Sequence, residues 1–244
     1  MQSDRKTVIV TGASQGIGAA IVQAFLARGY NVVGTARNAT KSKELSPSDD
    51  LALIDGDIGQ LETAQKVAEL AINKFGSIDA VVANAGIFVV KPFTDYTTDD
   101  FDALISTNLA GFIHITQLAV KQMQAQKTGG SVVAITAALA DNPIAGVTAS
   151  LAMITKGGLE TVTRHLAMEY AKQHIRFNAV APVLSIPRFT LTIRKNFSQR
   201  SRRWRPSQQW RTLPARSFIL PKRIKSQGKC CTSTAVRTLG NGNR

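Results

Sequence analysis

Six short apolar segments, separated by amphipathic segments of helical period, constrain the fold of this 244-residue chain more than any other feature. The apolar segments are bounded by turn residues and do not alternate strictly with polar residues, which is typical of strands buried on both faces of a sheet. They are residues 7–11, 31–35, 51–54, 78–83, 131–136 and 175–180, and the helical segments between them are 17–26, 61–75, 99–126 and 152–172. This order predicts an α/β fold with a doubly wound parallel sheet covered on both faces, because right-handed crossovers place the helices there.

Charge and cysteine are distributed unevenly along the chain. Residues 183–244 contain fifteen of the 30 basic residues and none of the 16 acidic ones, whereas residues 1–182 are close to neutral. The net charge of +14 therefore says nothing about the globular part. Both cysteines follow residue 183, so the first 182 residues offer no disulfide framework and no cysteine metal site, and the three scattered histidines show no ligand spacing. Without a signal-like or membrane-length apolar run, we expect a cytoplasmic protein with no membrane partner.

The first predicted strand runs directly into a glycine-rich loop, T-G-A-S-Q-G-I-G, and the first helix follows. Glycine allows a tight turn and a close backbone approach to a ligand, and the positive end of a helix favours an anion. The spacing between strand and helix is typical of a pyrophosphate-binding loop, although three glycines alone also fit a plain turn. The residues that we expect to contact the cofactor here are Gly12, Ser14, Gln15, Gly16, Ile17 and Gly18.

This glycine spacing resembles that of the short-chain dehydrogenase/reductase family, and further motifs of that family follow in order over residues 7–182. Asp57-Ile58 matches the pair that contacts adenine, Asn84-Ala85-Gly86 matches the sequence after the fourth strand, and Asn108 matches an asparagine within a helix. The resemblance implies a Rossmann-type sheet, a nicotinamide cofactor and hydride transfer to or from a small carbonyl or alcohol.

The end of the second strand indicates which cofactor is preferred. NAD-binding relatives usually place an acidic residue here to accept hydrogen bonds from the ribose, and this chain has Ala36 and then Arg37. A guanidinium can pair with a 2′-phosphate, so the sequence favours NADP(H) over NAD(H). The alternative is that Arg37 is an ordinary surface charge.

The catalytic motif of the family is incomplete. The resemblance implies a Tyr-x-x-x-Lys pair and a serine after the fifth strand; Lys156 matches the lysine, but Ala152 occupies the tyrosine position and Ala137 the serine position. Lys156 is expected to hold the nicotinamide ribose and Asn108 to keep a structural role. Hydroxyls of Thr136, Thr148 or Ser150 can bond a carbonyl but are poor acids near neutral pH. Two interpretations stay open, an oxidoreductase with altered proton transfer and an inactive cofactor-binding module.

The family motif stops at Pro182, and an out-of-frame sequence is our hypothesis for residues 183–244. Regrouping the possible codons by one base restores P-G-x-V-D-T-P after Pro182, and T-G-Q-V-L-H-V-D-G-G followed by a stop codon from residues 226–243. We therefore predict a dinucleotide-binding domain over 1–182, a basic tail without fixed structure over 183–244, and a missing last strand. The less favoured alternative is a nucleic-acid-binding tail, with Arg and Trp side chains on phosphates and bases. In relatives, helices 99–126 and 152–172 pack across a dimer interface, which implies an oligomer for the frame-restored protein.

Overall fold

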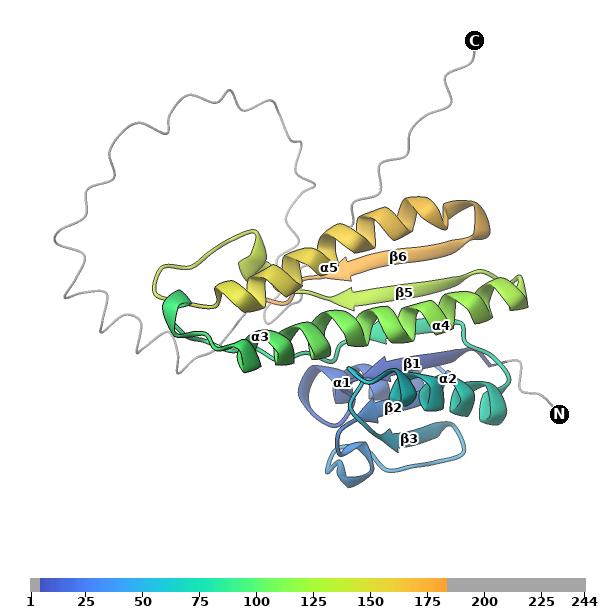
Figure 1. The fold of residues 1–244 in the computed structure, drawn as a ribbon. Helices are drawn as coiled ribbons and strands as arrows, with labels where there is room; N and C mark the ends of the chain where they lie inside the picture. The colour runs from blue at the N-terminus through green and yellow to red at the C-terminus, as the bar shows by residue number, and fades with distance from the viewer. Residues whose placement is uncertain (1–4, 184–244) are drawn as a thin grey trace, which may run out of the picture.

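The computed structural model describes residues 5–183, and the predicted basic tail lies, from residue 184 on, outside the described residues. Helices and strands alternate along the described chain (Figure 1). The strands are β1 Thr7–Thr11, β2 Asn31–Ala36, β3 Leu51–Asp55, β4 Ala80–Ala83, β5 Gly130–Ile135 and β6 Ile175–Val180. The α-helices are α1 Gly16–Leu26, α2 Leu61–Phe75, α3 Thr98–Leu104, α4 Gly111–Gln126 and α5 Ser150–Glu169.

The six strands form one parallel sheet in the order β3-β2-β1-β4-β5-β6. All six predicted strands are confirmed, with bounds that differ by at most two residues. The strand order reverses between β1 and β4, and a doubly wound sheet has its ligand crevice at this switch point, beyond the carboxyl ends of the strands.

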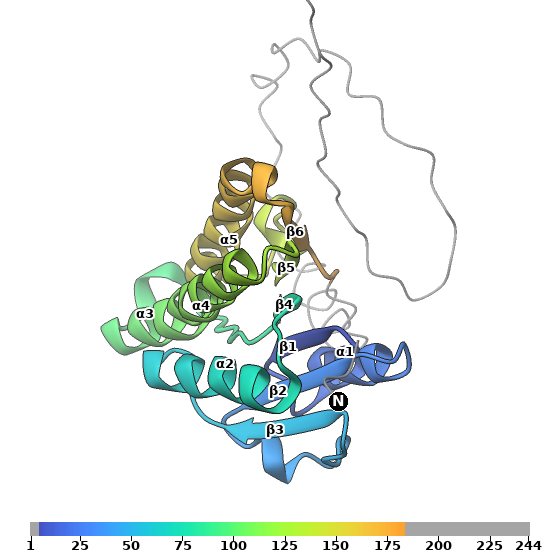
Figure 2. The same cartoon turned by 90° about the vertical axis from the view of Figure 1, so that its right-hand side faces the viewer.

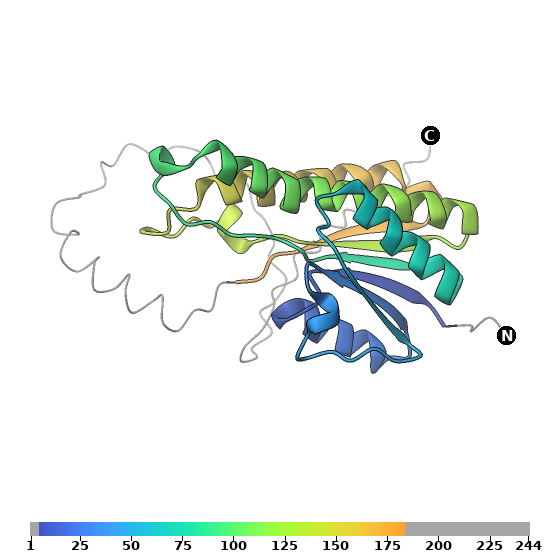
Figure 3. The same ribbon diagram turned by 60° about the horizontal axis from the view of Figure 1, so that its bottom comes forward.

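Helices cover the two faces of the sheet unequally (Figures 2 and 3). On one face, α2, α4 and α5 enclose the larger apolar cluster, in which Ile9, Ile115 and Ile175 are fully or almost fully buried. On the other face α1 packs over β1 and β2 around Val10 and Val22. Within residues 5–183 no helix covers β5 and β6 on that second face, so the expected cover on both faces is found over only part of the sheet.

The segment expected to form one long helix from residue 99 has a more complex structure. Thr97 begins it with a capping box, because its side chain accepts from the Asp100 amide while the Asp100 carboxylate accepts from the Thr97 amide. A π-helical turn at Ile105–Ala110 then separates α3 from α4 and contains Asn108. The span Thr98–Gln126 is long and apolar enough to cross a membrane, a test that core helices of soluble proteins also pass, and α4 packs against α2 and the sheet.

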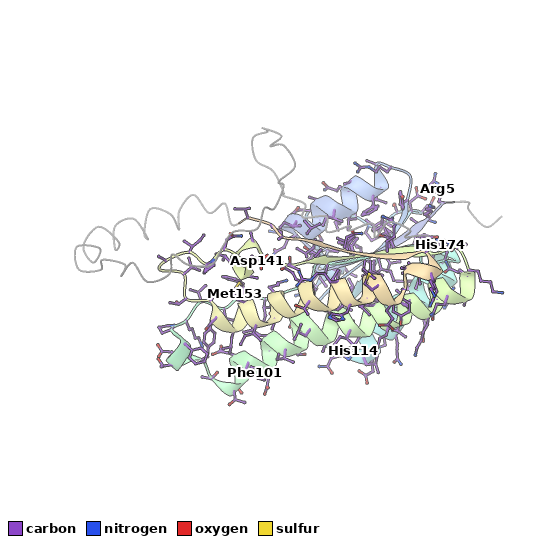
Figure 4. All side chains as sticks on the ribbon, turned by 90° about the horizontal axis from the view of Figure 1, so that it is seen from above. Arg5, Phe101, His114, Asp141, Met153 and His174 are labelled. Carbon is purple, nitrogen blue, oxygen red and sulfur yellow. The ribbon has the colours of Figure 1, made fainter. Side chains whose placement is uncertain are left out.

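The last helix ends earlier than its pattern predicts. We expected a helix to about residue 172, whereas α5 ends at Glu169 and a short 3₁₀ turn, Ala171–Gln173, follows. His174 then adopts a left-handed backbone conformation with φ of 58° and leads into β6. Figure 4 labels His174 and Arg5 at the amino ends of the strands, and Met153 at the opposite end, where the predicted site residues follow the strands.

Candidate functional site

The glycine-rich loop is held in place by the segment that follows β4. The Asn84 side-chain amide donates to the carbonyls of Thr11 and Gly12, both at 3.1 Å, and the Thr11 hydroxyl accepts from the amides of Asn84 and Ala85 at 3.1 and 3.0 Å. Gly12 has a φ of +66° and lies so close to Ala85 that a Cβ would be 2.8 Å from the Ala85 Cα. Asn84 and Ala85 therefore fix the loop, which is a structural role in addition to the contact with cofactor that we expected.

The start of α1 packs directly on this loop. A Cβ on Gly18 would lie 2.0 Å from the Gly12 carbonyl oxygen, which is closer than any real contact. The absence of a side chain at Gly18 lets the amino end of α1 approach the loop, and the first amides of a helix, which lack partners within the helix, favour an anion.

A pocket of about 850 Å³ opens beside the loop, beyond the carboxyl ends of β1, β2, β3 and β4. Twelve of the thirteen predicted cofactor-binding residues line it: Gly12, Ser14, Gln15, Gly16, Ile17, Gly18, Arg37, Asp57, Ile58, Asn84, Ala85 and Gly86. Its size, its glycine cradle and its charged rim fit a dinucleotide. That these residues bind a dinucleotide stays a prediction.

Sequence reasoning missed the part of the rim that follows β2. Lys41, Ser42, Lys43 and Glu44 also line the pocket. The 3₁₀ turn Ala39–Lys41 carries this segment and is tied to β3, because the Thr40 amide and hydroxyl donate to the Asp55 carboxylate at 2.8 and 2.6 Å. These hydrogen bonds lower the pKa of Asp55. The run K-S-K-E shortly after the second strand was the available signal.

Lys156, the thirteenth residue, lies behind Gly86 rather than in the lining of the pocket. A Cβ on Gly86 would be 3.0 Å from Lys156 Nζ and 3.2 Å from Asn108 Oδ1, so the two residues that match the family's catalytic lysine and asparagine lie beside the same glycine. Lys156 Nζ donates to the Ile135 carbonyl, the last of β5, at 2.7 Å. The structure thus brings together side chains from the π-turn and α5 at one wall of the pocket.

Asn108 has its side-chain amide fully engaged. Its Oδ1 accepts from the Ile87 amide at 2.8 Å, and its Nδ2 donates to the Ile87 carbonyl at 3.1 Å and to the Thr155 hydroxyl at 2.9 Å. The Thr155 hydroxyl donates in turn to the Ala152 carbonyl at 2.7 Å. Asn108 therefore joins the loop after β4 to α5, as expected for a structural role.

Burial changes the acidity of Lys156. Its side chain is 7% exposed, and desolvation lowers the pKa of the ammonium from 10.5 to about 8. No carboxylate among the described residues forms an ion pair with it. A fraction of the molecules therefore carries a neutral amine at mildly alkaline pH.

The two alanines at the expected tyrosine and serine positions have different surroundings. Ala152 is fully buried in an apolar cluster with Leu104, Ala149 and Leu151. Ala137 is half-buried and follows β5 after one residue, Thr136. Ala152 lies in the turn of α5 before Lys156, Ala137 lies shortly after β5, and neither supplies a hydroxyl. That these are the tyrosine and serine positions of the family stays a prediction.

Nearby hydroxyls are either bonded to the backbone or exposed to solvent. Thr136 is buried and donates to the Val180 carbonyl at 3.3 Å, while Thr148 and Ser150 are exposed. Tyr96 packs against the cluster that contains Ala152, but its hydroxyl donates to the Val89 carbonyl at 2.7 Å. Tyr170 lies at the far end of α5, where a hydrogen bond with Glu169 raises the pKa of its phenol. No described tyrosine presents a free hydroxyl beside Lys156.

A model of the short chain dehydrogenase family matches residues 6–195. A tropinone reductase homolog of Arabidopsis thaliana is 35% identical over 189 residues, which cover 73% of this chain and 68% of that protein. L-rhamnose 1-dehydrogenase (NAD(P)(+)) of Azotobacter vinelandii is 32% identical over 186 residues, 72% of each chain.

The chain belongs to the short-chain dehydrogenase family. The resemblance found in its motifs is therefore confirmed.

Solved structures agree with the family. The 3-ketoacyl-(acyl-carrier-protein) reductase of Brucella melitensis, complexed with NADH, superposes with a TM-score of 0.69 at 26% identity, covering 73% of this chain and 75% of that one. The 4-hydroxyisoleucine dehydrogenase complexed with NADH gives 0.65 at 25% identity, with coverage of 73% and 75%. The short-chain dehydrogenase fold of the described residues, a Rossmann-type parallel sheet, is confirmed.

We predict that Gly18→Ala destabilises this short-chain dehydrogenase domain by roughly 2 kcal/mol or more and weakens cofactor binding at least tenfold, because the new methyl group forces the loop away from α1. Urea unfolding and nucleotide titration measure the two effects. Gly157→Ala is the matched control, since a Cβ there has open space within a helix and should raise the free energy of unfolding by about 0.5–1 kcal/mol. Equal effects of the two substitutions contradict the role given to Gly18.

The lowered pKa of Lys156 predicts a dependence of stability on pH. Between about pH 8 and 10.5 the unfolded chain binds more protons than the folded one, so the free energy of unfolding rises with pH by roughly 3 kcal/mol. Below pH 8 the full penalty of burying the ammonium is present. Lys156→Met should remove most of this rise in urea unfolding measured from pH 7 to 10, whereas Lys66→Met, an exposed control on α2, should keep it. An unchanged slope in Lys156→Met refutes the prediction.

Proposed function

We propose that this chain is an NADP(H)-dependent oxidoreductase that transfers hydride to or from a small carbonyl or alcohol, with weakened proton transfer. The observation that carries the proposal is the pocket at the switch point of the sheet, with Lys156 and Asn108 against its Gly86 wall. Two solved structures that are 25–26% identical to this chain contain NADH, and the relative from Azotobacter is named for both NAD and NADP. These names support a nicotinamide cofactor in the same place.

The charge of the rim supports a preference for NADP(H). Arg37 follows β2 directly, and Lys41 and Lys43 add two more cations to the same pocket. Three cations at the ribose end attract a 2′-phosphate, and a guanidinium can bond it with two parallel donors. A bound nicotinamide dinucleotide would supply or accept the hydride. This chain would hold the dinucleotide through the glycine loop, the Asp57 and Ile58 backbone turn, and Lys156.

The surroundings of Ala152 and Ala137 support a second candidate, a cofactor-binding module without turnover. The described residues place no free hydroxyl of suitable acidity beside Lys156, and a positioned general acid contributes roughly 100- to 10,000-fold to such reactions. Loss of that acid leaves binding intact, because the loop, the rim and the lysine are independent of it. Membership of the family indicates only the chemical class of the substrate, a small carbonyl or alcohol.

Two surfaces support further parts of the proposal. A groove of about 410 Å³ runs along α4 and α5 and includes Phe112, Val120 and Leu166. An apolar groove on these two helices is consistent with the homo-oligomer that the resemblance implies. We also propose a cytoplasmic protein that acts on small molecules rather than on membranes or nucleic acids.

We predict that the chain binds NADPH and that its turnover of small carbonyls is slow. Ala137→Ser with Ala152→Tyr should raise kcat roughly 100-fold, because the phenol next to Lys156 restores a general acid. Nicotinamide fluorescence measures binding, and absorbance of the reduced cofactor measures turnover. Ala137→Ser with Ala152→Phe is the matched control, since it has nearly the same volume without the hydroxyl.

These measurements separate the candidates. NADPH binding with measurable turnover in the unsubstituted chain supports the oxidoreductase, and binding without turnover supports the module. A gain in kcat as large with Phe as with Tyr contradicts the assignment of Ala152, and absence of NADPH binding refutes both candidates.

We further propose that residues 183–244 arise from a one-base frame change at the junction of Pro182 and Val183. The expected outcome of sequencing the DNA there is a set of codons that, regrouped by one base, encode Gly-x-Val-Asp-Thr-Pro after Pro182 and the V-D-G-G ending before a stop. Codons that cannot be regrouped in this way reject the hypothesis. Residues 183–244 would then be a genuine basic segment, and binding of nucleic acid by it would be the alternative.

A further inference from the structure

The connection between β2 and β3 places a carboxylate on the glycine-rich loop. Glu44 Oε1 accepts from the Gly16 amide at 3.3 Å, and the Glu44 carbonyl accepts from the Gln23 side chain at 3.1 Å. The Ser42 hydroxyl donates to the Ser14 carbonyl at 2.7 Å and accepts from the Glu44 amide at 3.2 Å. Residues 42–44 therefore lie against the loop and the first turn of α1.

This carboxylate shares the pocket with three cations. Glu44, Arg37, Lys41 and Lys43 all line it, and all four belong to the same connection. The ion pairs among described residues, Arg5 with Asp50 and Lys91 with Asp100, involve none of them. The charge of Glu44 is therefore not neutralised by a direct partner within the described chain, and it acts on any anion that enters this end of the pocket.

An acid and a group of cations have opposite effects on a dinucleotide. A carboxylate near the ribose accepts hydrogen bonds from free hydroxyls and repels a 2′-phosphate, whereas arginine and lysine attract that phosphate. The end of β2 lacks the acid, since Ala36 stands there, but the chain returns one to the pocket eight residues later at Glu44. Its hydrogen bond to the Gly16 amide holds it at the positive end of α1.

We propose that Glu44 is a specificity-determining residue of the adenosine end of this pocket, whose carboxylate opposes the 2′-phosphate and so reduces the preference created by Arg37, Lys41 and Lys43. The inference rests on the proposed function, because it requires that a dinucleotide binds here. It makes this chain a binder of both cofactors, with a preference for NADP(H) that one acidic residue limits.

The test uses the 244-residue chain and two fragments that differ only in one phosphate, adenosine 2′,5′-bisphosphate and adenosine 5′-monophosphate. Calorimetric titration gives both dissociation constants. Glu44→Gln should tighten binding of the bisphosphate roughly fivefold, as expected for loss of one nearby like charge in a water-exposed site, and change the monophosphate less than twofold. The glutamine oxygen can still accept from the Gly16 amide, so the loop should stay folded.

Two further variants separate charge from other effects. Glu44→Asp keeps the charge, so it should change the ratio of the two dissociation constants less than twofold. Glu69→Gln removes a carboxylate from the exposed face of α2, outside the pocket, and should leave both constants unchanged. Circular dichroism and urea unfolding of each variant verify that the fold is intact.

The outcomes are distinguishable. A bisphosphate affinity that rises in Glu44→Gln while the monophosphate affinity stays constant supports the proposal. Equal changes for both fragments, or weaker binding of the bisphosphate, overturn it and leave the proposed function standing. Absence of binding of both fragments to the unsubstituted chain overturns the proposed function, and the role of Glu44 with it.

Discussion

The close approach of α1 to the glycine-rich loop is the contact on which the candidate site depends. A Cβ on Gly18 would collide with the Gly12 carbonyl. Because glycine has no Cβ, the helix and the loop can lie in contact here. Asn84 then bonds the same loop from the end of β4, so a segment that is distant in sequence joins the loop and the adjoining start of α1. The shape of the pocket follows from this contact, because α1 presents its amides only when the loop lies this close.

Most of the fold could be predicted because the central strands, such as β1 and β2, are buried along their length, which leaves unbroken apolar runs in the sequence. The helix boundaries that depend on tertiary contacts could not be predicted. The π-turn around Asn108 is held by side-chain bonds to Ile87 and Thr155, which no local pattern records. Helix α5 ends at Glu169 with Tyr170 as its cap, and the 3₁₀ turn that follows ends at the left-handed residue His174, so no glycine or proline marks this boundary in the sequence.

The site shows the same division. The residues that line the pocket from the ends of β1, β3 and β4 could be found from motifs, because each follows directly after a strand. Glu44 and Lys43 could not, since their place depends on how the 3₁₀ turn after β2 folds back, through the bonds of Thr40 to Asp55. No acid stands at the end of β2, where Ala36 is followed by Arg37. The folded chain supplies the acid from eight residues further along.

The part of the site that carries Lys156 is built independently of the hydroxyls that it lacks. Lys156 is anchored by the Ile135 carbonyl and Asn108 by Ile87 and Thr155, so neither side chain needs a group at position 152 or 137 to hold its place. The buried ammonium nevertheless destabilises the fold below about pH 8, because desolvation disfavours its charge. A buried lysine of this kind lowers the stability of the fold, but its ammonium can bind a polar group that enters the pocket at Gly86. In the proposed function, binding of a cofactor and transfer of a proton therefore depend on different residues.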